Sequence, residues 1–383
     1  MKYTLAINMT CFQKEHRGGK DEVAFNLLRG FEKNGVSKQM LCFCLKELEP
    51  TILEYAPNIN TCIVPKLNFG KDKIKGKWIL DSLIFSIFLK LWLHKNEVGA
   101  LLFANKLIRP YKCKANTMVI THDIKCFNGI SDDYSTPSFK IKMYFKRCVY
   151  EIKYEFKNRN HIIAISDFDK SEINKYMPYV KDKVKRIYDP ICFDKLEIKD
   201  IIGNDYLTVL NIQWTHKNVE TVIKTFASIK DKIKQKLILV GRFPSNIEYL
   251  KKLVVDLKVE DRVIFTGFVS TKELNEIVDK TRIYINASYF EGFGMTAVEM
   301  MGRGIPTIVA DNTSQKEVTK GLCRYFEPTD DYNALADVIL EELNNPMSKE
   351  QLQYNAKVMR ECYSYENIAK EYWDYVLECI NNK

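Results

Sequence analysis

The stretch that decides the fold reads Tyr284-Ile-Asn-Ala-Ser-Tyr-Phe-Glu291-Gly-Phe-Gly-Met-Thr-Ala-Val-Glu299-Met-Met-Gly-Arg-Gly-Ile-Pro306. An apolar strand ends in a loop of small residues, and a Glu-Gly-Phe-Gly turn then begins a helix. A Gly-x-Gly-x-Pro loop leads into the next apolar strand. Strand, helix and strand in this order are typical of a parallel sheet covered by helices.

The same alternation continues in both directions along the chain. Short β-branched or aromatic runs predict strands at 3–9, 39–45, 99–104, 117–121, 161–166, 184–188, 206–212, 236–240, 262–266, 283–286 and 305–309. Helical patterns predict helices at 19–33, 78–94, 138–157, 168–177, 216–229, 246–257, 271–279, 294–302, 332–343, 349–360 and 365–379. The sequence therefore predicts an α/β protein with doubly wound parallel sheets.

A polar stretch, Asp194–Asp205, interrupts the alternation and is interpreted as a linker. We therefore expect an N-terminal domain at residues 1–200 and a C-terminal domain at 201–364, with a closing helix at about 365–383 that packs back on the first domain. In doubly wound sheets ligands bind outside the carboxyl ends of the strands, so the cleft between two such domains is the expected site.

Composition narrows the class of protein. The chain has 383 residues, which is enough for two to three domains. It has 11 cysteines but no CxxC pair, which argues against a zinc site and favours free thiols in a reducing cytoplasm. The N-terminus lacks the pattern of a secretory signal, and the most apolar segment, 79–93, is too short and too charged to span a bilayer. A cytoplasmic location is the expectation.

The charge is uneven. Residues 1–200 carry 35 Lys and Arg against 23 Asp and Glu, whereas the rest of the chain carries 23 against 26. A basic half favours an anionic partner, such as a phosphorylated substrate or an anionic membrane surface. The sequence has no RNP-like run, zinc finger or helix-turn-helix signature, so we expect no nucleic-acid partner.

The turn at residues 291–294 carries the chemistry. Gly292 and Gly294 permit positive φ and a close approach of backbone amides, and the following helix start favours an anion such as a diphosphate. Glu291 and Glu299 suit sugar hydroxyls on either side of that diphosphate, because carboxylates form strong hydrogen bonds with hydroxyl groups. The alternative is that Glu299 is a solvated helix residue and Glu291 a neighbour of the helix cap.

This segment resembles the donor-site motif of retaining glycosyltransferases of family 4, within the glycosyl transferases group 1, which have the two-domain GT-B fold. Two further segments, Val263-Ile-Phe-Thr-Gly-Phe-Val269 and Ile163-Ala-Ile-Ser166-Asp-Phe, are similar to other parts of that family. The resemblance implies that Glu299 binds the ribose and Glu291 the transferred sugar. It also implies that backbone amides of Phe293, Met295 and Thr296 hold the sugar and diphosphate, and that Phe268 and Val269 lie against the base.

Lys217 begins a helix after the first strand of the second half, where a cation can stabilise a leaving diphosphate. A solvated first-turn lysine is the alternative. The family has a lysine here and usually an arginine about five residues earlier, but Ile212 stands at that position in this chain. Arg242, after the next strand, is the candidate for the second cation.

Two features of the first half are also candidates. Arg17-Gly18-Gly19-Lys20 follows the first strand, and the resemblance implies that this Gly-Gly loop contacts the donor phosphate and the acceptor. His122 ends a buried strand, where a neutral imidazole can bond a sugar hydroxyl, although a lone histidine is most often structural.

Together these features predict a retaining glycosyltransferase that moves a sugar from a nucleotide-sugar to a glycan or lipid-linked acceptor, for surface polysaccharide synthesis. No Asp-x-Asp pair stands at the end of a strand in a context suited to a metal, so we expect no metal and no other cofactor. The resemblance implies same-face displacement, with positioning and leaving-group stabilisation as the protein's role. The alternative is a catalytically weak glycosyltransferase-like partner subunit; an epimerase is disfavoured because the first strand lacks a G-x-x-G-x-x-G sequence.

Two basic segments fit helices that lie on an anionic lipid surface: Lys66–His94, with five lysines ahead of an apolar helix, and Lys140–Arg159. The alternative for each is a buried helix beside a solvated basic loop. The two interpretations are even for the first segment, and burial is favoured for the second. Contact with an anionic membrane would place the protein at the inner face of the membrane.

Overall fold

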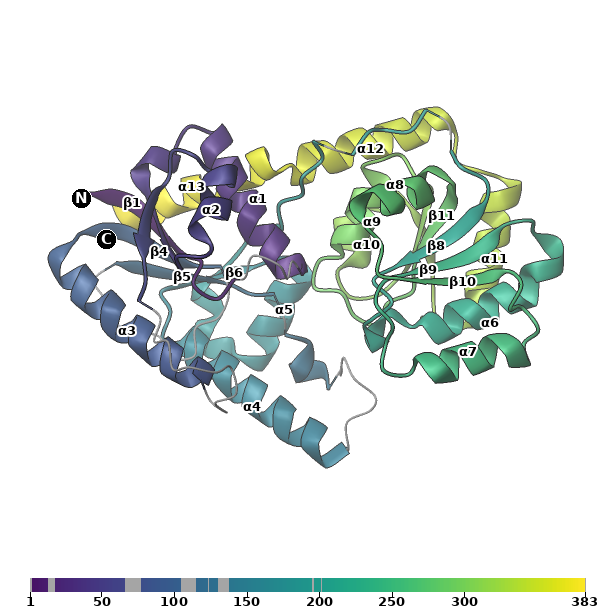
Figure 1. Ribbon diagram of the computed structural model, residues 1–383, viewed down its shortest axis with the longest axis horizontal. Coiled ribbons are helices and arrows are strands. Elements are labelled where there is room, and N and C mark those ends of the chain that lie inside the picture. The colour runs from purple at the N-terminus through teal and green to yellow at the C-terminus, as the bar shows by residue number, and fades with distance from the viewer. Residues whose placement is uncertain are drawn as a thin grey trace. The chain divides into compact units, whose positions relative to one another are not determined.

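The computed structural model describes residues 2–12, 18–65, 77–104, 115–122, 124–129, 138–194, 196–200 and 202–382 (Figure 1). The chain divides into two compact units. Unit 1 comprises residues 1–124, 146–192 and 363–383, and unit 2 comprises residues 125–145 and 193–362. Each unit is built around one sheet whose strands all run parallel.

The sheet of unit 1 has seven strands in the order β3-β2-β1-β4-β5-β6-β7. They are β1 (Tyr3–Asn8), β2 (Met40–Cys44), β3 (Asn60–Ile63), β4 (Val98–Phe103), β5 (Asn116–Ile120), β6 (His161–Ala164) and β7 (Val184–Arg186). The central strands are continuously apolar and fully buried, as expected for a parallel sheet covered on both faces. The order reverses direction after β1, so β1 and β4 flank the switch point where such sheets bind ligands.

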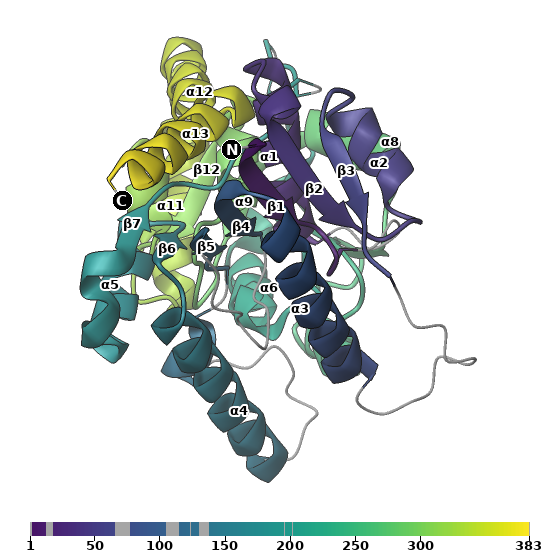
Figure 2. The ribbon, with the colours of Figure 1, turned by 90° about the vertical axis from the view of Figure 1, so that its left-hand side faces the viewer.

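The helices of unit 1 cover that sheet. They are α1 (Gly19–Lys33), α2 (Glu49–Tyr55), α3 (Lys77–Lys95), α5 (Asp167–Tyr176), α13 (Tyr365–Asn381) and, from Lys146 onward, α4 (Ser138–Lys157). The last helix, α13, packs along α1, as Figures 1 and 2 both show. The two helices touch at Gly30, where a Cβ atom would collide with the carbonyl of Tyr365 and the Cβ of Ala369, so only glycine allows this close approach.

Unit 2 has a six-stranded sheet in the order β10-β9-β8-β11-β12-β13. Its strands are β8 (Tyr206–Leu210), β9 (Lys236–Val240), β10 (Val263–Gly267), β11 (Thr281–Asn286), β12 (Thr307–Ala310) and β13 (Arg324–Phe326). Its helices are α6 (Val219–Ile229), α7 (Ile247–Asp256), α8 (Thr271–Asp279), α9 (Met295–Met301), α10 (Gln315–Val318), α11 (Tyr332–Asn344) and α12 (Lys349–Tyr363). Aliphatic residues of β8, β9 and β11 pack with α6 and α11 into one core.

The order of this second sheet reverses at β8, so the ends of β8 and β11 lie side by side. The loop after β8 leads to Lys217 and the loop after β11 carries Glu291. Two residues that are far apart in the sequence are thereby brought to one edge of the sheet.

The predicted fold class is confirmed: the chain folds as two doubly wound α/β units. Four short elements were not predicted, namely α2, β3, α10 and β13. β3 is an edge strand with exposed ends, and α10 and β13 have only four and three residues, so none of the three produces a long apolar or periodic pattern. The predictions that involve Arg17, Lys66–Lys75 and Asp123 lie outside the described residues. Among the helices that are described, none has the length and apolar character needed to cross a membrane.

Candidate functional site

Glu291 and Lys217 form a buried ion pair at the carboxyl edge of the second sheet. The Lys217 ammonium lies 2.5 Å from Oε1 of Glu291, and the side chains are only 9% and 12% exposed. Lys217 ends a short turn, Thr215–Lys217, that is closed by Asn218 in the left-handed conformation. The Asn218 side chain fixes this turn, because its amide donates to the Thr329 carbonyl and its oxygen accepts from Thr221. The structure thus brings the predicted catalytic lysine and glutamate into direct contact.

The pair leaves one carboxylate oxygen of Glu291 available. Ser288 Oγ lies 2.7 Å from Oε1, and the Asn286 amide donates to the same oxygen at 3.4 Å. Oε2 accepts no hydrogen bond from any residue that the structure describes. An ionised carboxylate can accept about four hydrogen bonds, so Oε2 is free to accept from the hydroxyl of a ligand.

The environment keeps Glu291 ionised. Burial acts to raise the pKa of this carboxyl, but the charges of Lys217 and His216 and the hydrogen bonds from Lys217 and Ser288 outweigh it, so the pKa lies below 4.5. At neutral pH Glu291 is therefore a fixed negative charge that is held in one rotamer and cannot act as a proton donor.

In the glycine turn after Glu291, Gly294 has the positive φ that the sequence suggested. Gly294 has φ of +92° and caps α9, and a Cβ there would lie 3.9 Å from the Glu291 side chain. The Tyr284 hydroxyl lies 2.7 Å from the Thr296 hydroxyl and fixes the first turn of α9. No side chain caps this helix. The first-turn amides are therefore oriented toward the same edge of the sheet as Glu291.

A second loop supports this turn, and sequence reasoning missed it. After β12, the Ser314 hydroxyl lies 2.8 Å from the Glu291 carbonyl and 3.3 Å from the Phe293 carbonyl, and Thr313 accepts from the Glu291 amide. Ser314 is fully buried, and Thr313 has φ of +48°, an uncommon value for a threonine. The signal was present, since Asp311-Asn-Thr-Ser314 follows an apolar strand at its carboxyl end.

Glu299 lies on α9, two turns beyond Glu291, and is half-buried. It lies close enough to the Arg303 guanidinium for its charge to act on the pKa of that group. Burial lowers the pKa of Arg303, and the carboxylates of Asp279 and Glu299 act against this effect. The side chain of Glu299 therefore has a cationic neighbour in the turn that follows α9, and it is only partly buried.

The ends of β9 and β10 bring Arg242 and Phe268 together. The Arg242 guanidinium lies 5.7 Å from the centre of the Phe268 ring, and that ring is 76% exposed, whereas Val269 is half-buried. Gly267, with φ of +70°, lets the chain turn before Phe268. An exposed aromatic ring beside a cation is a suitable surface for stacking a base.

Ile212 occupies the place where the resemblance leads one to expect arginine. Its side chain is 0% exposed and packs in the hydrophobic core of unit 2, directly after β8. An arginine there would bury an unpaired charge, so this position cannot supply a cation in this backbone conformation. Lys217 is the cation that contacts Glu291 among the described residues.

In unit 1, Gly18 and Gly19 lie at the start of α1, and His122 follows β5. Gly18 caps α1 through its amide, which donates to Asp21, and Gly19 is the first residue of that helix. His122 Nε2 lies 2.9 Å from the Ala104 carbonyl after β4. Burial and the charge of Lys20 hold the pKa of His122 well below 6.5, so the ring is neutral at physiological pH.

Neither glycine of this pair requires the left-handed conformation. Gly18 is extended, with φ of −95°, and a Cβ there would meet open space. The structure therefore gives the glycine pair no conformational role in the free protein. Small residues at these positions leave the amino end of α1 accessible.

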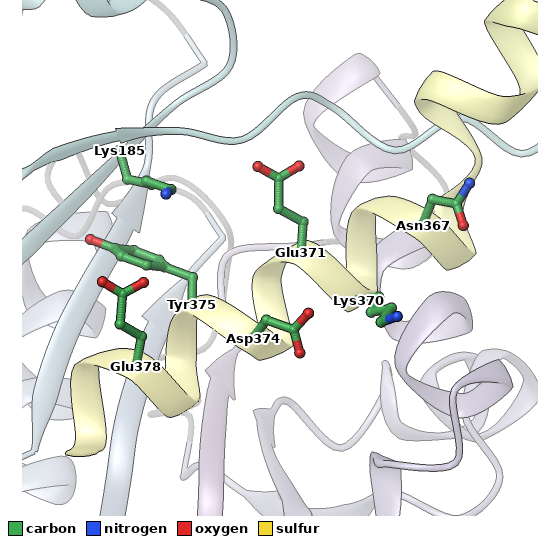
Figure 3. Close-up of a pocket in the computed structure, with 7 residues that line it drawn as sticks. All are labelled: Lys185, Asn367, Lys370, Glu371, Asp374, Tyr375 and Glu378. Carbon is green, nitrogen blue, oxygen red and sulfur yellow. The ribbon is translucent and has the colours of Figure 1, made fainter. Parts of the chain in front are cut away.

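A surface pocket of about 440 Å³ lies apart from these residues, between β7 and α13 of unit 1 (Figure 3). Its lining consists of lysine, acidic and amide side chains together with Tyr375, and contains none of the predicted site residues. Across the described residues, no cluster of three or more His, Cys, Asp or Glu side chains is arranged to hold a metal ion.

Comparison with known proteins finds a family match in unit 2. Residues 203–359, which contain the whole sheet of unit 2, match the family model described as glycosyl transferases group 1. The O-antigen chain mannosyltransferase RfbU of Salmonella typhimurium is 27% identical over 265 residues, which cover 69% of this chain and 70% of that protein. The uncharacterized glycosyltransferase MJ1607 of Methanocaldococcus jannaschii is 29% identical over 229 residues, covering 55% of this chain and 58% of that protein.

Solved structures match over both units. The sucrose-phosphate synthase of Thermosynechococcus elongatus superposes with a TM-score of 0.75 at 16% identity, covering 99% of each chain. Anabaena HepE, solved in complex with UDP and glucose, superposes with a TM-score of 0.69 at 14% identity, covering 98% of this chain and 99% of that one. The chain thus has the GT-B fold of glycosyltransferases, and its residues 203–359 match glycosyl transferases group 1.

Proposed function

We propose that this protein is a retaining glycosyltransferase that moves a sugar from a nucleotide-sugar to a glycan or lipid-linked acceptor during surface polysaccharide synthesis. The observation that carries the proposal is the Glu291–Lys217 pair beside the glycine turn, with Oε2 of Glu291 left for a ligand. A carboxylate suits a sugar hydroxyl, and a cation and backbone amides suit a diphosphate.

Each part of the donor has a matching group in unit 2. Glu291 accepts a hydrogen bond from the transferred sugar, and amides from Phe293 to Thr296 hold the sugar and the diphosphate. Glu299 binds the ribose hydroxyls. The exposed ring of Phe268, with Arg242 beside it, supports the base. This assignment gives a role to residues at the carboxyl ends of β9, β10 and β11.

The proposed mechanism needs positioning rather than a protein nucleophile. Lys217 stabilises the negative charge that develops on the leaving diphosphate, and its buried position strengthens that interaction. Glu291 is ionised and lacks a proton to give, so the leaving phosphate itself receives the proton of the acceptor hydroxyl on the same face of the sugar. No metal takes part in this proposal. His122, which is neutral, is assigned a hydrogen bond to a sugar hydroxyl.

The sugar is proposed from the relatives. Three of them have mannosyltransferase names, namely RfbU, the O-antigen chain mannosyltransferase B and the serotype-specific WbdA of Escherichia coli, at 22–27% identity. We therefore propose mannose as the first donor sugar to test. The described cysteines are free thiols, which fits synthesis in a reducing cytoplasm.

Assays of transfer and of donor hydrolysis with UDP-, GDP- and dTDP-sugars test the proposal. Wild type is expected to cleave at least one donor, with retention of the anomeric configuration by NMR. The variant Glu291→Ala is expected to lose at least a hundredfold in rate. Glu248→Ala is the matched control, because Glu248 lies on α7 with its side chain 84% exposed. Equal loss in both variants, or an inverted product, contradicts the proposal.

A second candidate is a catalytically weak partner subunit that binds the donor. The observation that favours it is the buried Ile212, which leaves the site without the arginine that the resemblance leads one to expect. This candidate predicts donor binding by calorimetry without turnover in any assay. Turnover by the chain alone excludes it.

A further inference from the structure

The helix α4 has an unusual exposed face. Phe139, Met143, Tyr150 and Tyr154 are 73%, 53%, 69% and 42% exposed. At 3.6 residues per turn these four side chains project within about 60° of one another, so they form one stripe along a single continuous helix. The rings of Tyr150 and Tyr154 stack with centroids 6.3 Å apart, which keeps the stripe flat at that end. We call these four residues the α4 stripe.

The opposite face of α4 already has its packing partners. Cys148, Ile152 and Phe156 are buried. Glu155 is also buried and accepts from Arg159 at 2.8 Å, with side chains 2% and 0% exposed. Because this buried face already packs the helix against the protein, the apolar and aromatic side chains of the α4 stripe are not needed for that packing.

Cations border the α4 stripe on both sides. By helical position, Lys142, Lys146 and Lys153 lie along one side, Lys157 continues the stripe and Arg147 lies on the other side, and all five are exposed. The two acidic residues of the helix are Glu151, whose side chain is 15% exposed and pairs with Arg147, and the buried Glu155. The exposed face is therefore strongly positive, with aromatic and apolar side chains between the charges.

The helix α3 is less suited to the same role in its described part. The rings of Phe85 and Trp92 pack on Phe43 of β2, with centroids 6.1 Å and 5.2 Å away. Lys90 and Lys95 are its exposed cations from residue 84 onward. The sequence favoured burial for the basic segment at 140–159. The structure shows instead that α4 exposes more aromatic side chains and cations than the described part of α3.

We propose that the α4 stripe and its bordering cations dock the protein on a bilayer of anionic lipid. Aromatic side chains favour the headgroup region, lysine and arginine attract anionic phosphates, and a helix with both on one face lies along the membrane surface. Figures 1 and 2 show α4 as one long helix, and the exposed fractions of the four stripe residues make this face accessible to a flat surface. None of the α4 stripe residues is among the residues assigned to the donor.

Vesicle sedimentation of the full chain tests the proposal, with phosphatidylglycerol-rich and pure phosphatidylcholine vesicles at low and high salt. Wild type is expected to bind the anionic vesicles and to release at high salt. Lys142→Gln with Lys146→Gln is expected to weaken binding about 25-fold, at about fivefold per cation. Phe139→Ser with Tyr150→Ser is expected to weaken it about tenfold.

Matched controls lie on unit 2. Lys251→Gln with Lys252→Gln removes two exposed cations from α7, and Tyr354→Ser removes a ring that is 56% exposed on α12. These variants are expected to bind like wild type. Donor hydrolysis without vesicles reports on the donor site alone and is expected to be unchanged in the α4 variants, so a failure of the proposed function is distinguishable.

Three outcomes overturn the proposal. The first is equal binding to neutral and anionic vesicles. The second is loss of binding in the controls as large as in the α4 variants. The third is unchanged vesicle binding by the α4 variants together with a fall in mass by light scattering, which assigns the stripe to contact with a second copy of this chain.

Discussion

Replacing Lys217 by methionine removes one charge from the proposed donor site while keeping most of the packing volume. The pair that it breaks is buried on both sides, with side chains 9% and 12% exposed and a 2.5 Å contact. Breaking a buried pair by removing one partner costs about 3–5 kcal/mol, because the other charge stays buried and uncompensated. We expect about 3 kcal/mol here, since Glu291 keeps Ser288 as a partner and Oε2 stays free for water.

The pKa of Glu291 determines how the loss of stability in Lys217→Met changes with pH. In wild type the folded-state pKa of Glu291 lies below 4.5, so the pair's contribution is present above 4.5 and is lost as the pH falls through the folded pKa. In Lys217→Met, burial is no longer offset by the lysine, and the pKa of Glu291 rises. The variant is then least stable relative to wild type at neutral pH, and the difference shrinks on acidification through the raised pKa.

Urea unfolding followed by circular dichroism at neutral and acidic pH measures this difference, and hydrogen exchange over residues 284–301 assigns it to unit 2. Lys224→Met is the matched control, because Lys224 pairs with Glu220 on α6 with side chains 42% and 38% exposed. Its effect is expected to stay within about 0.5 kcal/mol. A loss in Lys217→Met no larger than in this control, or one that grows on acidification, refutes the assignment of a buried pair.

Further predictions address the donor and its supports. Glu299→Gln is expected to weaken nucleotide-sugar binding in calorimetry by about tenfold or more, through loss of charged hydrogen bonds to the ribose; unchanged affinity contradicts the role. Phe268→Ala is expected to weaken binding of the free nucleotide about fivefold or more by removing a stacking surface. Tyr249→Ala on α7 is the control and is expected to leave nucleotide binding unchanged. Ser314→Ala is expected to lower the free energy of unfolding by about 1–2 kcal/mol, because two loop carbonyls lose their donor, and to raise hydrogen exchange at 291–296. His122 has a pKa held below 6.5, so its stabilising contribution is present above 6.5 and lost as the pH falls; an NMR titration that shows an imidazolium at pH 7 would rule this out.

The sequence predicted the fold because the central strands of both sheets are mostly apolar. In Lys236–Val240 and Tyr206–Leu210 the last four residues are buried, and each strand precedes an amphipathic helix. The elements that escaped prediction are weak for physical reasons. β3 lies at an edge with half of its residues exposed, and β13 is held by pairing with β12 rather than by its own three residues.

The arrangement of the candidate site was predicted in part. The glycine turn and its two glutamates form a contiguous motif, so their neighbourhood could be predicted from residues 291–299 alone. The pairing of Glu291 with Lys217 was not readable, because 74 residues separate them and only the neighbouring positions of β8 and β11 bring them together. Ser314 was missed for a related reason, since a hydroxyl becomes informative only when its two carbonyl partners are known.

Hydrogen–deuterium exchange of wild type, with and without a saturating nucleotide-sugar, tests the central claim most directly. The account predicts slower exchange on binding at the glycine turn, residues 291–297, and at residues 267–269 after β10, with the turn's protection reduced in Lys217→Met. Binding that protects only unit 1, or no binding of any UDP-, GDP- or dTDP-sugar, would contradict the account.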